Sequence, residues 1–187
     1  LRAALVSGQN LLKILNDILD YSKIESGALQ PEESTFSLHG LVRDIVVLLR
    51  PGADAKGVHL WLDAPADLPD VVRGDAAKLR QILFNLLSNS LKFTEEGEVI
   101  LRVRTNGESN GRLQIAFEVS DTGKGISDEA KSRIFEAFEQ EDSDTARRFG
   151  GTGLGLAISK HFAETIGARL SLESAQGIGS VFTLALE

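Results

Sequence analysis

The sequence contains neither cysteine nor methionine, and it has one tryptophan and one tyrosine. Without cysteine it can form no disulfide bond and no thiolate metal site. Without methionine it lacks a start residue, so we expect it to be a piece of a longer protein. No apolar run reaches the roughly 18 residues that a transmembrane helix needs, and no signal-peptide pattern is present. Neither a membrane span nor a secretion signal is therefore predicted.

Positive charge is also scarce. The 20 Lys and Arg residues face 27 Asp and Glu residues, which gives a net charge of −7. This balance argues against a nucleic-acid partner, because such proteins usually present a basic surface. A small polyanion could still bind if a cation accompanies it. With 42% hydrophobic and 25% charged residues over 187 positions, the composition is that of a globular protein long enough to bury a substantial core.

Apolar residues near the start of the chain recur at helical spacing and predict one long helix over residues 1–26. These apolar residues are Leu5, Leu11, Leu12, Ile14, Leu15, Ile18 and Leu19. Two pairs repeat at seven, so two neighbouring stripes of the helix are apolar, and such a surface needs partners. We expect a bundle with a helix of a second chain or of a missing upstream segment. Folding back onto the rest of the chain is the alternative.

Glycine and proline within residues 26–34 mark the best domain boundary, which divides the chain into residues 1–30 and 31–187. Beyond it, strands are predicted at 35–38, 58–62, 71–73, 98–105, 113–120, 169–174 and 180–186, and helices at 39–55, 76–94, 127–138 and 153–166. Residues 106–111 are expected to form a turn and residues 139–149 a mobile loop. This order predicts an α/β sandwich in which a mixed sheet carries helices on one face.

The stretch 81–94 combines an apolar helical face with polar groups at regular spacing. Asn85, Asn89 and Lys92 stand at i, i+4 and i+7, which at roughly 100° per residue places them on one side of a helix. Asp75 is expected to cap the start of this helix. Amides beside an ammonium group suit a metal-bound phosphate. A solvated polar stripe on an ordinary amphipathic helix is the alternative.

Two glycine-rich runs lie downstream. In residues 121–126, a carboxylate at a strand end and alternate glycines would accept a hydrogen bond from the exocyclic amine of adenine and let the backbone approach a flat ligand. Residues 149–158 open a helix, where free amides and small residues form a concavity for phosphate. The alternatives are a local turn capped by Asp121 and a flexible hinge without ligand.

Two familiar nucleotide motifs are excluded. A dinucleotide fingerprint needs a sixth-position glycine, but counting from Gly151 that position is Leu156. A P-loop needs Gly-Lys followed by Ser or Thr, and here Lys124 precedes Gly125.

Two aromatic residues between the glycine runs, Phe135 and Phe138, are expected in the core. The three histidines have no neighbouring nucleophile and no metal-ligand spacing, so no catalytic or metal-binding role is assigned to them: His39, His59 and His161.

Together these segments resemble the motifs of sensor histidine kinases. The runs NLLSNSLKFT (85–94), DTGKGI (121–126), FEAF (135–138) and GTGLGL (151–156) are similar, in that order, to the N, first glycine, F and second glycine boxes of the family. Residues 174–182 look like its third glycine region. The run SKIESG (22–27) is similar to the end of the second dimerisation helix of hybrid sensor kinases. The resemblance extends from Gln9 to Glu187.

The resemblance implies the fold of the histidine kinase and Hsp90-like ATPases, with ATP and Mg²⁺ as ligands. It makes Asn89 the Mg²⁺ ligand, and Asn85 and Lys92 the catalytic residues that also contact the nucleotide. The remaining implied nucleotide-binding residues are Phe93, Asp121, Gly123, Gly125, Ile126, Arg147, Arg148, Gly151, Thr152, Gly153, Leu154, Gly155, Leu156 and Ser180. Of these, Asp121 would accept from the adenine amine, and residues 139–149 would form a lid over the phosphates.

The resemblance further implies that residues 1–30 are part of a dimerisation domain and residues 31–187 the ATP-binding catalytic domain. The phosphoacceptor histidine of the family is absent, so the γ-phosphate would pass to a histidine outside this chain. From there it would reach a response-regulator receiver domain. A homodimer through the dimerisation helices and a cytoplasmic location beneath a parent anchored in the bacterial inner membrane are also implied. For this stretch itself we expect no nucleic-acid partner and no direct membrane contact.

Two other functions stay open. Chaperones, type II topoisomerases and mismatch-repair ATPases of the same broad fold place a water-activating glutamate four residues before the metal-binding asparagine. Here that position is Asn85, and an amide cannot take a proton from water at neutral pH, so hydrolysis should be slow. The second alternative is a regulatory module that binds a partner without catalysis.

Overall fold

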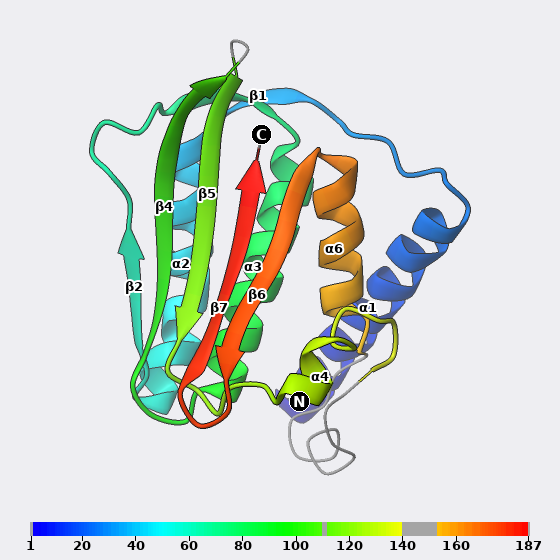
Figure 1. Ribbon diagram of the computed structural model, residues 1–187. Coiled ribbons are helices and arrows are strands. Elements are labelled where there is room, and N and C mark those ends of the chain that lie inside the picture. Colours follow the sequence, from blue (N-terminus) through cyan, green and yellow to red (C-terminus); the bar gives the residue numbers. More distant parts are fainter. Residues whose placement is uncertain (1, 110–111, 140–152, 187) are drawn as a thin grey trace.

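The computed structural model describes residues 2–109, 112–139 and 153–186 (Figure 1). In chain order the elements are α1 (Arg2–Glu25), β1 (Ser34–Ser37), α2 (Leu38–Lys56), β2 (His59–Asp63), β3 (Val71–Gly74), α3 (Ala76–Phe93), β4 (Glu98–Ser109), β5 (Arg112–Asp121), α4 (Asp128–Lys131), α6 (Gly155–Thr165), β6 (Ala168–Ala175) and β7 (Gly179–Leu186). Most of the elements predicted from periodicity are confirmed, with boundaries shifted by one or two residues.

Five strands form the main sheet in the order β2-β4-β5-β7-β6. Strand β2 runs parallel to β4, and all other neighbours in this sheet are antiparallel. Helices α2, α3 and α6 lie across one face of the sheet (Figure 1). Strands β1 and β3 form a separate antiparallel pair. The predicted sandwich with a mixed sheet and helices on one face is therefore confirmed.

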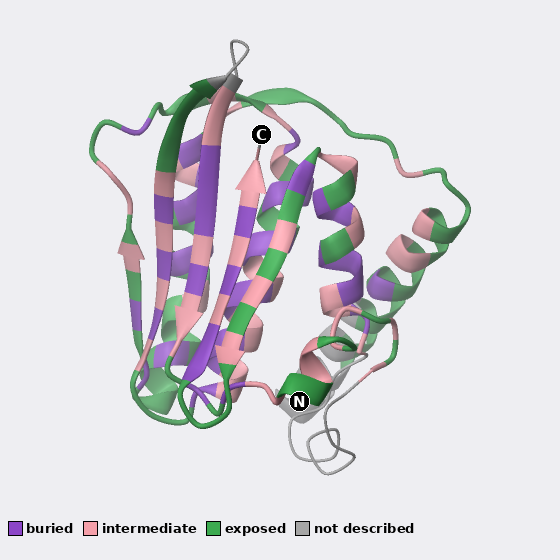
Figure 2. Cartoon of the chain, viewed as in Figure 1, coloured by how far each residue is buried: buried purple, intermediate pink, exposed green. Residues whose placement is uncertain are grey.

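The core lies between the helices and the sheet, where Figure 2 shows the buried residues. Helix α3 is central to it because its apolar face is almost completely buried: Leu79, Ile82, Leu83, Leu86, Leu87 and Leu91. Burying each such side chain contributes about 1.5–3 kcal/mol. Lys56 at the end of α2 donates to the carbonyls of Leu91 and Thr94, which satisfies the last turn of α3. The polar side of α3 is thereby held in a fixed orientation.

The start of α3 is fixed by a buried ion pair. Asp75 is the N-cap, as predicted, and its Oδ1 accepts from the amide of Lys78 at 2.9 Å. Its Oδ2 accepts from Lys78 Nζ at 2.7 Å and from the Glu32 amide at 2.8 Å. Lys78 Nζ also donates to the carbonyl of Gln30 at 2.9 Å. The segment that links α1 to β1 is therefore tied to the first turn of α3.

Two predictions about local structure were wrong. The helix predicted over residues 127–138 stops at Lys131, although Ser127 caps its start as expected. It cannot continue to Phe138, because that residue has a φ of 67°, in the left-handed region. The turn predicted at residues 106–111 is wrong for residues 106–109, since β4 continues to Ser109 past a register irregularity between Thr105 and Glu108.

Helix α1 lies beside α6 at the edge of the molecule (Figure 1). One side of this helix contacts the domain, which agrees only in part with the alternative that it folds back. Gln81 Nε2 on α3 donates to Asp20 Oδ2 of α1 at 2.9 Å. The apolar stripes nevertheless remain exposed at Leu11, Leu12, Ile14, Leu15, Ile18 and Leu19. Among the described residues, no helix is long and apolar enough to cross a membrane.

Candidate functional site

The polar side of α3 carries the three residues that sequence spacing singled out. Asn85, Asn89 and Lys92 are all half-buried. The Asn85 amide nitrogen donates to the Gly155 carbonyl and, at 3.0 Å, to Ser159 Oγ on α6. A Cβ atom at Gly155 would lie 2.8 Å from that nitrogen. Asn85 therefore joins α3 to the first turn of α6, a packing role that the sequence did not predict.

Asn89, one turn further along α3, has a different environment. Within the described part of the chain its side chain makes no hydrogen bond, although it is half-buried. A half-buried amide oxygen without a protein donor is a suitable ligand for a hard cation. The geometry is consistent with the predicted role of Asn89 as a metal ligand.

Two ammonium groups gather around Phe93 at the end of α3. Lys92 Nζ lies 4.9 Å and Lys124 Nζ 5.4 Å from the centre of its ring. Both contacts are cation–π interactions. Two cations thus lie near one aromatic ring, in a chain whose net charge is −7. Such a site suits the phosphates of a small polyanion, and Lys124 was not singled out from sequence.

Asp121 stands at the end of β5 with both carboxylate oxygens engaged. Ser90 Oγ on α3 donates to Oδ2, and the Gly123 amide donates to Oδ1, each at 3.0 Å. Burial raises the pKa of Asp121, while the Gly123 amide, the Ser90 hydroxyl and the backbone of Ser180 oppose that rise. Ser90 was not predicted from the sequence, because the i, i+4, i+7 spacing singles out its neighbour Asn89 and not Ser90. A carboxylate held in this way can still accept a bond from an exocyclic amine.

The glycines that follow Asp121 are required by the protein's own packing. A Cβ atom at Gly123 would lie 2.6 Å from the Phe93 carbonyl oxygen, and one at Gly125 would lie 2.0 Å from that of Ala175. Gly125 also has a φ of 66°. These close approaches involve the backbone of α3 and of the β6–β7 turn, whereas the sequence suggested approach to a ligand. The turn at 121–126 is thus clamped between two elements.

Ser174 completes this clamp and was not predicted. Its Oγ accepts from the Ile126 amide at 2.9 Å and lies 3.0 Å from Ser180 Oγ. Ser180 is buried and faces Asp121 in the β5–β7 register. The structure therefore brings Asp121, Ile126 and Ser180 together, as the site prediction requires.

The second glycine run is only partly visible. Arg147, Arg148, Gly151 and Thr152, with nearly all of the predicted lid, lie outside the described residues. Gly153 has a φ of 70°, Leu154 is buried, and α6 begins at Gly155. The first turn of α6, which includes Leu156, contains no acidic residue. An uncapped helix start of this kind is suited to an anion.

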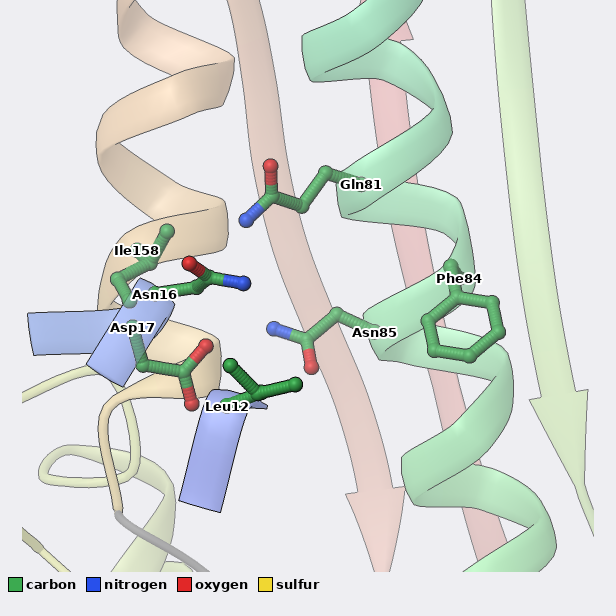
Figure 3. Close-up of a pocket in the computed structure, with 7 residues that line it drawn as sticks. All are labelled: Leu12, Asn16, Asp17, Gln81, Phe84, Asn85 and Ile158. Atoms are coloured by element: carbon green, nitrogen blue, oxygen red, sulfur yellow. The ribbon is translucent and has the colours of Figure 1, made fainter. Parts of the chain in front are cut away.

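A pocket of about 410 Å³ lies between α1, α3 and α6. Figure 3 shows Gln81 and Asn85 of α3 pointing toward Asn16 and Asp17 of α1. The remaining lining residues are Leu12, Phe84 and Ile158.

No group of three or more His, Cys, Asp or Glu residues that could hold a metal exists among the described residues. A cation bound by Asn89, which does not line this pocket, would need further ligands from the nucleotide.

These groups fit an adenine nucleotide with a divalent cation. Asp121 at the β5 end would meet the base, and the ammonium groups of Lys92 and Lys124 would meet phosphates. Asn89, the residue before Ser90 on α3, would meet the cation. The fit rests on the donors and acceptors present, and each one is supplied by α3 or by a loop packed against it.

Comparison with known proteins agrees with this fit. The family profile "Histidine kinase-, DNA gyrase B-, and HSP90-like ATPase" matches residues 74–187. The sensor histidine kinase AruS of Pseudomonas aeruginosa is 44% identical over 189 residues, covering 100% of this chain and 19% of AruS. The histidine-protein kinase BarA of Escherichia coli K12 is 42% identical over 176 residues, covering 94% of this chain and 19% of BarA. The chain thus spans about a fifth of the length of these curated relatives.

Solved structures lead to the same group. Full-length ShkA, crystallised in complex with AMPPNP, has a TM-score of 0.82 at 33% identity, covering 96% of this chain and 36% of ShkA. The histidine kinase AdeS of Acinetobacter baumannii has a TM-score of 0.77 at 19% identity, covering 100% of this chain and 82% of that structure, and this likeness concerns the fold alone. The chain belongs to the histidine kinase-, DNA gyrase B- and HSP90-like ATPase family, as a catalytic domain of the sensor histidine kinase type.

Proposed function

We propose that this domain binds Mg-ATP and presents the γ-phosphate to a histidine outside residues 1–187. One observation carries the proposal: α3 offers Asn89 and Lys92 within the same short stretch that brings Ser90 to Asp121. A single rigid helix thus spans the base and phosphate ends of the site. Residues 31–187 would form the catalytic domain, and residues 1–30 would belong to a dimerisation domain.

Each residue has a defined task in this proposal. Asp121 orients the base by accepting a hydrogen bond, and Ser90 and the Gly123 amide hold its carboxylate in place. Lys92 stabilises negative charge on the phosphates, and Asn89 holds Mg²⁺, which when bound would neutralise further phosphate charge. Catalysis is then mainly positioning and charge stabilisation, as expected for phosphoryl transfer.

Asn85 separates this proposal from ATP hydrolysis. Its amide nitrogen donates to Gly155 and Ser159, and an amide cannot deprotonate water at neutral pH. We therefore expect the isolated domain to release inorganic phosphate slowly. A fast, steady release of phosphate, measured with γ-labelled ATP, would favour a hydrolase and overturn the proposal.

The direct test restores the upstream helix of the parent protein and follows labelled γ-phosphate into protein. We expect an acid-labile, base-stable label, typical of phosphohistidine, that disappears with Asn89→Ala. Label that survives this change would show that Asn89 is not the metal ligand. Calorimetric titration of the chain with Mg-ATP tests the regulatory alternative, because no saturable heat at millimolar nucleotide would favour a module without catalysis.

The partners follow from the same proposal. The phosphorylated histidine would pass its phosphate to an aspartate of a response-regulator receiver domain. The parent would act as a dimer through helices such as α1, whose apolar stripes are exposed. The domain would lie in the cytoplasm of a bacterium, with its parent in the inner membrane. Transfer of label from the restored protein to a purified receiver domain tests the relay.

A further inference from the structure

Phe138 is held in an unfavourable backbone conformation at the surface. It is the only residue other than glycine with a positive φ in the described part of the chain, at 67°. Its side chain is 67% exposed, so the expected place in the core was wrong for Phe138, whereas Phe135 does pack against the core. For a bulky residue this conformation costs about 1–3 kcal/mol and persists only when neighbouring contacts maintain it.

Two contacts maintain Phe138 in this conformation. Its amide donates to the Gly153 carbonyl at 3.1 Å. Its ring meets the Tyr21 ring of α1 edge to face, with the ring centres 6.0 Å apart at an angle of 68°. Edge-to-face pairs contribute about 0.5–1.5 kcal/mol beyond burial. Tyr21 therefore offsets much of the cost of the Phe138 conformation.

Phe138 contacts Gly153, which lies just before the start of α6. Gly153 is left-handed with a φ of 70°, and a Cβ atom there would lie 2.9 Å from Phe138 Cα. Gly153 precedes Leu154, which is 1% exposed, and then Gly155, where α6 begins. The Gly155 carbonyl accepts from Asn85 of α3. A continuous series of contacts thus runs from α1 through Phe138 to the phosphate side of the site.

We propose that Tyr21 is a positioning residue for the nucleotide site: its ring holds Phe138, and through Gly153 it sets the start of α6. This inference rests on the proposed function, because the site it positions is the nucleotide site. The position of α1 then alters nucleotide affinity, and bound nucleotide alters the contact at Tyr21 by the same free energy. The long helix thereby acts on the catalytic domain through the Tyr21–Phe138 contact.

The first experiment measures Mg-ATP binding to the chain by calorimetry. Tyr21→Ala should weaken binding about two- to tenfold, which corresponds to the free energy of one aromatic pair. Tyr21→Phe keeps the ring and should bind as the parent chain does. Leu19→Ala is the matched control, since Leu19 lies on the same helix and is 58% exposed. Equal affinity of Tyr21→Ala and the parent chain would overturn the inference.

A double-mutant cycle identifies the route. In a Phe138→Ala background, Tyr21→Ala should have no further effect on nucleotide affinity, because the ring pair is already lost. An equal loss in both backgrounds would show that Tyr21 acts elsewhere and would overturn the inference. Thermal unfolding of each variant identifies any change in affinity that comes from loss of the fold.

A second measurement needs no substitution. Tyr21 is the only tyrosine in the sequence, so uniform 3-fluorotyrosine labelling gives a single fluorine resonance that reports its ring. We expect this resonance to shift on addition of Mg-AMPPNP with the affinity found by calorimetry. Nucleotide binding with an unmoved resonance would overturn the role of Tyr21 and leave the proposed function standing. No binding in either measurement would overturn both.

Discussion

Asn89 is the residue at which cation binding can be tested alone. Its half-buried amide makes no hydrogen bond to the described residues, so removing it breaks none there. We expect Asn89→Ala to lower the affinity for Mg-ATP about tenfold or more while affinity without Mg²⁺ changes little. Titrations with and without Mg²⁺ measure this. Asn106→Ala, at an exposed amide of β4, is the control. An unchanged Mg²⁺ dependence in the first variant would contradict the assignment.

Asp121 should govern the choice of base and its dependence on pH. Burial raises the pKa of this carboxyl group, so it protonates at a higher pH than an exposed aspartate. The charged form accepts from the adenine amine and repels the guanine carbonyl. The preference for ATP over GTP should therefore fall as pH is lowered from neutral toward this raised pKa.

The substitution Asp121→Asn supplies the matching test. The amide can donate to guanine, so the ratio of ATP to GTP affinity should fall about tenfold or more and lose its pH dependence. Competition titrations at several pH values measure the ratio. A preference for ATP that survives in Asp121→Asn would mean that other groups read the base.

At the level of single residues, the sequence was informative where a chemical group and its spacing coincide. Asp121 at a strand end and Asn89 on a helix face became candidates in this way, and their roles in binding remain predictions. Ser90 and Ser174 could not, because serine is common and their contacts join residues 31 and 48 positions apart. The second role of Asn85 depends on the packing of α6 against α3, which no local pattern encodes.

Among the elements, α3 begins at the buried pair Asp75 and Lys78, whose side chains are only 1% and 11% exposed. Burial alone would raise the pKa of Asp75, but the Glu32 amide and the Lys78 ammonium and amide together lower it. A lowered pKa contributes stability that is present at neutral pH and is lost as pH falls through the folded-state pKa. The ion pair should therefore stabilise the protein at pH 7 and fail in acid.

We expect Asp75→Asn to destabilise the protein by about 3–5 kcal/mol at pH 7, since it leaves a buried ammonium without its counter-ion. The variant should lose less stability than the parent chain when the pH is lowered below about 4. Urea unfolding at both pH values measures this. Asp128→Asn breaks a pair of the same spacing at a side chain that is 93% exposed, and should change little. Similar losses in the two variants would refute the role of burial.

Elements with a strong period and a cap could be predicted from sequence, and α3 is the best example. The end of α4 could not be predicted, because the helical pattern continues to residue 138 while a long-range contact at Tyr21 accompanies the reversal of Phe138. The sequence indicated that glycines are needed in residues 121–126, but it suggested close approach to a ligand as the reason, whereas the structure shows close approach to the protein backbone. Gly125 is required by the Ala175 carbonyl, which lies 50 positions away in sequence.

At the scale of the whole molecule, the exposed stripes of α1 should cause self-association. Seven-residue spacing of apolar residues is the pattern that helices use to pair. We expect the chain to form dimers in a concentration-dependent manner, and Leu11→Glu with Ile18→Glu to make it monomeric. Sedimentation equilibrium measures the change. Val47→Glu with Leu48→Glu places the same charges on exposed apolar residues of α2 and should leave association unchanged.

The relation of α1 to the rest of the molecule was the least predictable feature. The amphipathic pattern of α1 indicates that the helix packs against a partner, but it does not identify that partner. In the structure, two surfaces of α1 have different environments. One surface meets α3 through Asp20 and Gln81, 61 positions apart, and the other faces solvent. The proposed division at residue 30 remains a prediction.

The short distance between Asn85 and Gly155 constrains how the sequence can change over evolution. Any side chain at position 155 would push the Asn85 amide away from its two acceptors on α6. We therefore expect related sequences to change these two positions together, with a larger residue at 155 accompanied by a smaller one at 85. A glutamate at 85, the residue that would favour hydrolysis, would also place an anion against a carbonyl oxygen. On the proposed function, the choice between phosphotransfer and hydrolysis would then be inherited through this residue pair.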